Sequence, residues 1–133
     1  MGCVSATEKG KLIGVRVNSK EDITSEKCEI LKSAQVIFAH NIIDQTNKAL
    51  EIATPTLEER PDYKRLMLVK PVFSTDTSEE YLKNSWDVAA KIISQYLDTG
   101  RNVAFLALED IDESDFRYVD ERLSEEYIIE KIN

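Results

Sequence analysis

The chain has 133 residues and a formal net charge of −8, from 17 Lys and Arg against 25 Asp and Glu. This length predicts one domain with a single core. The negative charge, with no cluster of basic residues, argues against binding to nucleic acid or to an anionic membrane surface.

Cysteine and histidine are scarce. Cys3 and Cys28 have no spacing typical of a disulfide scaffold or a zinc site, and one histidine cannot complete a common metal cluster. No apolar run approaches the roughly 20 residues that span a bilayer, and the N-terminus lacks a secretory signal. We therefore expect a cytoplasmic protein without a bound metal.

The first third of the chain predicts two strands joined by a helix. Residues 1–10 are small and polar and are expected to form a flexible lead-in. Residues 11–17 and 36–39 are rich in β-branched and other apolar residues and predict strands. Between them, Thr24 is suited to cap a helix through Ser33, because its hydroxyl can accept hydrogen bonds from first-turn amides. The inner face of that helix is predicted to carry Cys28, Ile30, Leu31 and Ala34.

The middle of the chain predicts a helix and a third strand. The helix is expected over 42–53, with Ile43, Thr46, Leu50 and Ala53 facing inward. Pro55 and Pro61 are expected to bound a loop, since neither can extend a helix interior. The strand is expected over 65–69.

The clearest helix-to-strand transition lies in the second half. A long helix is predicted over 79–98, capped by Thr77 or Ser78 and anchored in the core by Trp86. Gly100 suits the left-handed residue that ends a helix. The apolar run 103–108 then predicts a central strand that is buried on both sides.

After that strand, the sequence predicts an acidic loop over 109–113 and a final helical face. This face consists of Phe116, Val119, Leu123 and Tyr127. Strands that alternate with helices predict an α/β fold over 11–133. We expect a mostly parallel sheet of four or five strands with helices on both faces, a three-layer sandwich.

In such sheets, ligands bind beyond the carboxyl ends of the strands. The loops at those ends are 18–22, 40–41, 71–76 and 109–113, and none is rich in the glycines that cradle phosphate. His40 follows the second strand and could act as acid or base, but the sequence identifies no orienting partner, which favours a loop or capping role.

The acidic loop carries candidate ligands for a cation. Asp110, Asp112, Glu113 and Asp115 have oxygen ligands suited to Mg²⁺ or Ca²⁺, but the turn glycine and closing Glu of a calcium loop are missing. A solvated loop that precedes a helix is the stronger interpretation.

Several segments together resemble the N-terminal half of the tetrapyrrole (corrin/porphyrin) methyltransferase family, most closely the precorrin-2 C-20 methyltransferases of cobalamin biosynthesis. The segments are GKLIGVRV, ITSEKCEILKSAQVIFAH, NKALEIA, KPVF, TGRNVAFLAL and FRYVDERL. The resemblance runs from about Lys11 to Leu123. It implies a domain that holds a tetrapyrrole and S-adenosylmethionine against a second, C-terminal domain that this chain lacks.

The resemblance implies a set of binding residues. Gly14 and Asn18 correspond to the family's first glycine-rich loop, Pro71 follows the third strand, and Asp110 is the residue kept from a Gly-Asp-Pro motif. Arg16 and Lys20 could pair with carboxylates of the ligand. Most of the family's loop glycines are replaced, which would hinder the close approach of a ligand.

Three functional hypotheses follow. The chain could be half of a methyltransferase, inactive alone, that is either cut from a longer enzyme or completed by a complementary chain. It could instead be a diverged, non-catalytic binding or interaction module on the same scaffold, and the lost glycines favour this alternative. A receiver- or flavodoxin-like domain ranks lowest, because paired acids do not follow the first strand directly. Family resemblance also implies a homodimer.

Overall fold

A computed structural model of the chain describes residues 8–76 and 78–133, and within them the fold is an α/β three-layer sandwich. The central sheet is parallel throughout and contains β1 (Lys11–Arg16), β2 (Val36–Phe38), β4 (Met67–Val69), β6 (Val103–Ala107) and β7 (Ile128–Ile132). The helices are α1 (Ser25–Ser33), α2 (Lys48–Glu58), α3 (Glu79–Asp98) and α4 (Phe116–Leu123). A small parallel pair, β3 (Asn41–Ile42) and β5 (Val72–Phe73), completes the fold.

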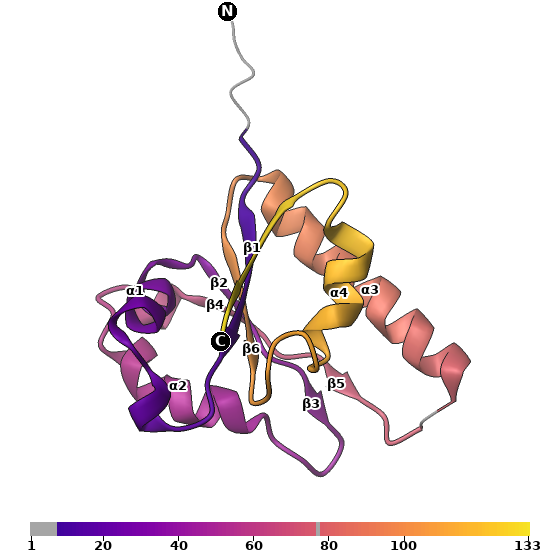
Figure 1. Cartoon of the computed structure of the whole chain (residues 1–133), viewed down its shortest axis with the longest axis horizontal. Coiled ribbons are helices and arrows are strands. Elements are labelled where there is room, and N and C mark those ends of the chain that lie inside the picture. The colour runs from indigo at the N-terminus through magenta and orange to yellow at the C-terminus, as the bar shows by residue number, and fades with distance from the viewer. Residues whose placement is uncertain (1–7, 77) are drawn as a thin grey trace, which may run out of the picture.

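The strand order in the sheet is β4-β2-β6-β1-β7. Figure 1 shows α1 and α2 on one face of the sheet and α3 and α4 on the other. The core is divided accordingly: alternate residues of β6 pack toward opposite faces, with Phe105 among the α3–α4 side chains and Leu106 among those of α1 and α2. All five residues of β6 are buried, which confirms the predicted central strand over 103–107, whereas Leu108 is exposed and lies outside it.

Polar caps define the start of three helices. The side chains of Thr24, Asn47 and Ser78 accept hydrogen bonds from first-turn amides of α1, α2 and α3. The long helix α3 ends where Gly100 adopts a φ of +83°, the left-handed conformation predicted for it. Thr77, the other predicted cap of α3, lies outside the described residues, as do residues 1–7 of the predicted lead-in.

The predicted helix over 42–53 is wrong at both ends. Ile42 belongs to β3, and the exposed Ile43 donates its backbone N–H to Phe73 in a strand-type ladder. The helix begins at Lys48 because Asn47 caps it, and it continues through Pro55 instead of stopping before it. Buried Ala53 and Leu57 hold this last part of α2 against the sheet despite the proline.

Other predictions needed smaller corrections. Residues 63–65 form a short 3₁₀-helix, so the third strand begins at Met67. Ile128–Ile132 form a fifth strand, for which the sequence predicted no residue range. On α1, Leu31 is buried as expected, but Cys28 is only half-buried and Lys27 is buried instead. The ammonium of Lys27 reaches Asp22, 3.1 Å away.

β3 and β5 extend the sheet beyond its carboxyl edge. Backbone N–H groups of Ala39, Asn41 and Ile43 donate to the carbonyls of Val69, Pro71 and Phe73, so that one ladder runs from β2–β4 into β3–β5. In Figure 1 this pair projects past the ends of the main strands. We call residues 41–43 with 72–73 the ribbon, and it forms a wall for the sites described below.

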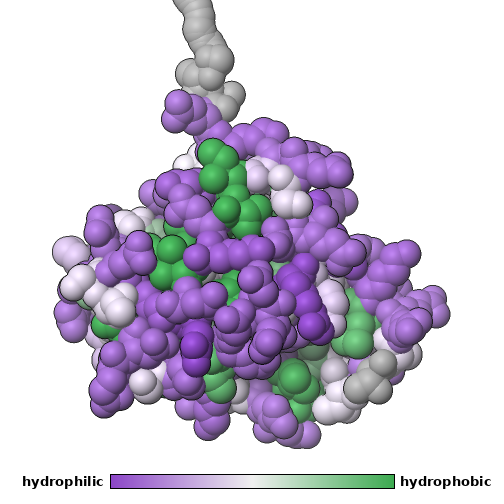
Figure 2. All heavy atoms as spheres, viewed as in Figure 1, coloured by the Kyte–Doolittle hydropathy of each residue, from purple (hydrophilic) through white to green (hydrophobic). Residues whose placement is uncertain are grey.

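The face of the molecule shown in Figure 2 is mainly hydrophilic, with separate apolar patches. Within the described residues, no helix is both long and apolar enough to cross a membrane.

Candidate functional site

The sheet has a switch point between β2 and β6, which are neighbours. The helix after β2, α2, covers one face, whereas the helix after β6, α4, covers the other. The two connections therefore diverge at the carboxyl edge and leave a crevice, the usual position of a ligand site in open α/β sheets.

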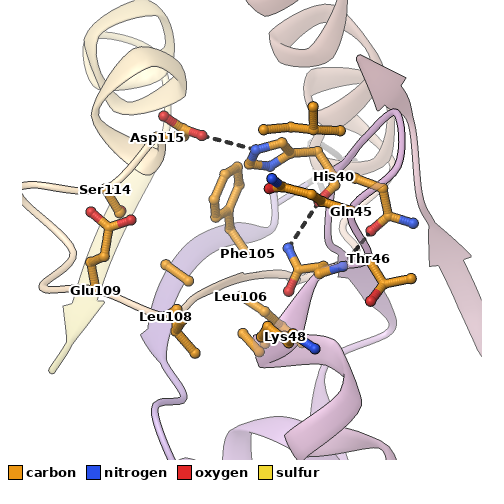
Figure 3. Close-up of a pocket in the computed structure, with 15 residues that line it drawn as sticks. His40, Gln45, Thr46, Lys48, Phe105, Leu106, Leu108, Glu109, Ser114 and Asp115 are labelled. Atoms are coloured by element: carbon orange, nitrogen blue, oxygen red, sulfur yellow. Dashed lines mark hydrogen bonds and ion pairs between the residues drawn. The ribbon is translucent and has the colours of Figure 1, made fainter. Parts of the chain in front are cut away.

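A cleft of about 220 Å³ occupies this crevice. We call it the switch-point cleft (Figure 3). Its lining comprises His40, Asn41, Ile42, Gln45, Thr46, Asn47, Lys48, Ala49, Phe105, Leu106, Ala107, Leu108, Glu109, Ser114 and Asp115. The end of β6 forms its apolar floor, and the walls are polar. This combination suits a small polar molecule, or one polar edge of a larger one, because complete drug-sized pockets begin near 300 Å³.

The wall that follows β2 is held by a hydrogen-bonded pair of asparagines. Asn47 accepts from the amide of Leu50 at 2.9 Å and donates its side-chain amide to the carbonyl of His40 at 3.0 Å. Asn41 accepts from the backbone amide of Asn47 at 2.8 Å. The start of α2 and the end of β2 are thereby fixed to each other.

His40 and Asp115 connect the two sides of the crevice. Nε2 of His40 lies 2.9 Å from Oδ2 of Asp115, the residue that precedes α4. Asp115 makes no capping bond of its own, and the Ser114 hydroxyl accepts from the amide of Phe116 instead. The orienting partner that the sequence did not identify is therefore present, brought to His40 by the adjacency of β2 and β6.

The imidazole of His40 is enclosed by aromatic rings. Its centroid lies 5.2 Å from that of Phe73 in a stacked arrangement and 5.0 Å from that of Trp86 in an edge contact. Nδ1 is buried and has no hydrogen-bond partner among the described residues. A reacting group could reach Nδ1 only after local movement of the surrounding side chains. In this structure the His40–Asp115 pair therefore holds the cleft walls in position and does not present an accessible base.

A second cleft, of about 300 Å³, lies on the other side of His40 and Asp115. We call it the aromatic cleft. Its described lining comprises His40, Ile42, Phe73, Ser74, Thr75, Asp76, Leu82, Trp86, Asp115 and Tyr118. The His40–Asp115 pair thus separates two adjoining cavities. Trp86 is buried, as predicted, and also contributes to the wall of this cleft.

Gly14 lies in the middle of β1 and is covered by core side chains. A Cβ atom built there would be 2.9 Å from Cγ2 of Ile111 and 3.1 Å from the ring of Phe116. The missing side chain makes room for the loop before α4 to pack on β1. In this structure Gly14 faces the protein interior.

The other residues at the end of β1 are engaged locally. Asn18 is exposed and donates its backbone N–H to the carboxylate of Asp22, and Lys20 is an exposed residue of a short 3₁₀-helix. Desolvation opposes ionisation of Asp22, but hydrogen bonds from Lys27 and from the Asn18 amide hold its pKa below the ordinary value. Arg16 is half-buried, and its Nε has no partner among the described residues.

Pro71 and Asp110 lie apart from one another. Pro71 connects β4 to β5 and accepts the amide of Asn41, whereas Asp110 accepts the amide of Asp112 in the loop after β6. β2 separates the strand before Pro71 from the strand before Asp110. None of the six predicted contact residues appears among the residues that line the switch-point cleft or the aromatic cleft.

The acidic loop is occupied by contacts within the chain. Asp112 lies 2.8 Å from the ammonium of Lys131, which also contacts Asp120, and Asp115 is bound to His40. Across residues 8–76 and 78–133, no group of three or more His, Cys, Asp or Glu side chains is arranged to hold a metal ion.

Sequence reasoning missed the partnership of His40 with Asp115 and the role of Phe73. The sequence places both His40 and Asp115 after the carboxyl ends of strands. Their contact could have been predicted only if those two strands had been known to be neighbours. No protein-family model and no curated protein matches this chain.

Proposed function

We propose that this chain is a non-catalytic small-molecule-binding module on a scaffold like the N-terminal half of the tetrapyrrole methyltransferases, and that it acts in the cytoplasm. The observation that carries the proposal is the switch-point cleft with its fixed polar walls and the His40–Asp115 pair. Such a position is where open α/β sheets bind ligands.

The covering of Gly14 favours a binding module over an intact methyltransferase half. In the resemblance, the loop after the first strand lets cofactor and substrate approach the backbone. Here Ile111 and Phe116 occupy the space beside Gly14, and Asn18 is bound to Asp22. A ligand in that position would have to displace buried side chains, at a cost in hydrophobic burial.

The ligand class follows from the cleft and from the resemblance. Lys48 lines the cleft and carries a positive charge, with its ammonium 3.5 Å from Glu51, and the side-chain amides of Asn41 and Gln45 supply donors. The acids in the lining are Glu109 and Asp115, and Asp115 is paired with His40. A carboxylate of a tetrapyrrole-like molecule matches this set, and the cleft volume of about 220 Å³ suits a carboxylate-bearing edge rather than a whole macrocycle.

Calorimetric titration tests this proposal with two probes, S-adenosylhomocysteine and uroporphyrin, separately and together. We expect uroporphyrin to bind and to shift the backbone NMR signals of His40, Asn47 and Ser114, and S-adenosylhomocysteine to give no saturable heat. Lys48→Ala should weaken uroporphyrin binding, while Lys32→Ala, an exposed change on α1, should not. Saturable binding of S-adenosylhomocysteine would overturn the non-catalytic assignment.

A second candidate is a methyltransferase half that needs a complementary chain carrying the C-terminal domain and S-adenosylmethionine contacts. It is supported by the exposed apolar residues of the ribbon, Ile42, Ile43 and Val72, at the edge where a second domain would pack. Methyl transfer to precorrin-2 only on addition of such a chain would favour this candidate.

A further inference from the structure

We propose that the aromatic cleft binds an organic ammonium cation, of the quaternary or methylated kind. This inference goes beyond the function proposed above, because it concerns the other cavity and a ligand of opposite charge.

The walls of this cleft are aromatic and come from three different elements. Trp86 of α3 is at their centre: its ring lies 4.9 Å from that of Phe73 on β5, at an interplanar angle of 88°, and 5.5 Å from that of Tyr118 on α4, at 28°. His40 completes the group through its contacts with Phe73 and Trp86. These four side chains pack against one another, with Trp86 2% and Phe73 8% exposed, and all four line the cavity. Aromatic rings attract quaternary ammonium groups.

The charged side chains that line the cleft are acidic. They are Asp76 on the loop before α3 and Asp115 at the start of α4, and the described lining includes no Lys or Arg. Asp115 shares its charge with His40, while Asp76 is exposed at the rim. A carboxylate near an aromatic wall attracts a cation and disfavours an anion.

The nearest basic residues do not line the aromatic cleft, although Arg117 contacts one of its walls. Arg122 lines the adjoining groove, where its Nε bonds Asp87 at 2.6 Å. Arg117 lies over the ring of Tyr118, 4.8 Å from its centroid, and bonds the Tyr118 hydroxyl. Lys83 also lines that groove and does not line the aromatic cleft. With a net charge of −8, the whole chain adds a field that concentrates cations.

The test compares choline with 3,3-dimethylbutanol, which has the same shape and no charge. Trp86 is the only tryptophan of the chain, so its fluorescence reports this cleft directly. We expect choline to change the Trp86 emission saturably and to bind at least about tenfold more tightly than the alcohol. Equal affinities, or no saturable response to choline, would overturn the proposal.

Variants locate the site. Asp76→Asn and Tyr118→Leu should each weaken choline binding about threefold to tenfold. Tyr118→Phe keeps the ring but loses the hydroxyl bond to Arg117, so it should retain the affinity, and Glu58→Gln on the opposite helical layer serves as the surface control. Circular dichroism verifies that each variant is folded. Wild-type affinity in both Asp76→Asn and folded Tyr118→Leu would contradict the assignment.

Discussion

Gly14 serves packing in this structure, although the resemblance to the methyltransferases implies that it contacts a ligand. Its φ is not in the left-handed region, so a side chain there is opposed by space alone. Ile111 and Phe116 are both fully buried and cannot move into solvent.

We therefore expect Gly14→Ala to lower the free energy of unfolding by about 1–3 kcal/mol, since overpacking a core site forces neighbours to shift. Urea denaturation measures this. Ile111→Ala removes the closest methyl group, and the double variant should lose less stability than the sum of the single changes. Additive losses would show that the two positions do not compete for the same space.

Tyr127 is a buried residue whose ionisation is opposed. Burial, together with its hydrogen bond to Asp98 at 2.6 Å, raises the pKa of Tyr127 to about 12 from an ordinary 10.0. Because the folded-state pKa exceeds the unfolded value, the stabilisation is complete below about pH 10 and is lost as pH rises toward 12.

The measurable quantity is the difference in unfolding free energy between wild type and Tyr127→Phe. We expect wild type to lose about 1 kcal/mol relative to the variant between about pH 9 and about pH 11. The comparison cancels the titration of the lysines and the other tyrosines. A difference that stays constant over this range would contradict the raised pKa.

Among the elements, α2 tolerates a feature that ordinarily ends a helix. Pro55 is exposed and inside the helix, where it cannot donate to the carbonyl of Glu51. Pro55→Ala should raise the free energy of unfolding by about 1–2 kcal/mol. This is the cost of proline inside a helix, reduced by the stabilisation that proline gives by restricting the unfolded chain. Glu58→Ala, an exposed change in the same helix, should have little effect. An unchanged or lower urea midpoint for Pro55→Ala would refute this expectation.

The same region explains where sequence reasoning reached its limit. The caps Thr24 and Ser78, the helix end at Gly100 and the buried run of β6 are local signals, and the structure confirms them. β3 is different, because Ile42 and Ile43 become strand-like only by pairing with residues some thirty positions later.

Non-local pairing also hid much of the candidate site. The sequence identifies Asp115 only as one of several acids near the loop after β6, and its neighbours in sequence favour a solvated loop. Its contact with His40 depends on β6 lying beside β2, which the alternation of elements alone does not specify. Likewise, β7 is a strand because the edge of β1 offers it a ladder.

At the scale of the whole molecule, the exposed ribbon favours association. Ile43 is 47% exposed and Val72 is 62% exposed, at the carboxyl edge of the sheet. We expect the chain to self-associate reversibly at micromolar to millimolar concentration, and Ile43→Lys or Val72→Lys to abolish this. Val88→Lys replaces a side chain on α3 that is 58% exposed and should leave association intact. Sedimentation velocity measures the association state of the wild type and of each variant over this concentration range. A wild-type chain that stays monomeric throughout the range would refute the prediction.

The position of β6 between β1 and β2 has a consequence for synthesis on the ribosome. β1 and β2 are made first, yet each needs β6 as its neighbour, and β6 appears only after about three-quarters of the chain. Until then, β2 and β4 are the only described main-sheet strands able to pair, and β6, which joins β1 to β2 and adds Ala104 and Leu106 to the core beneath α1 and α2, is missing. The main sheet can therefore close only late in translation, once β6 is available to place β1 beside β2.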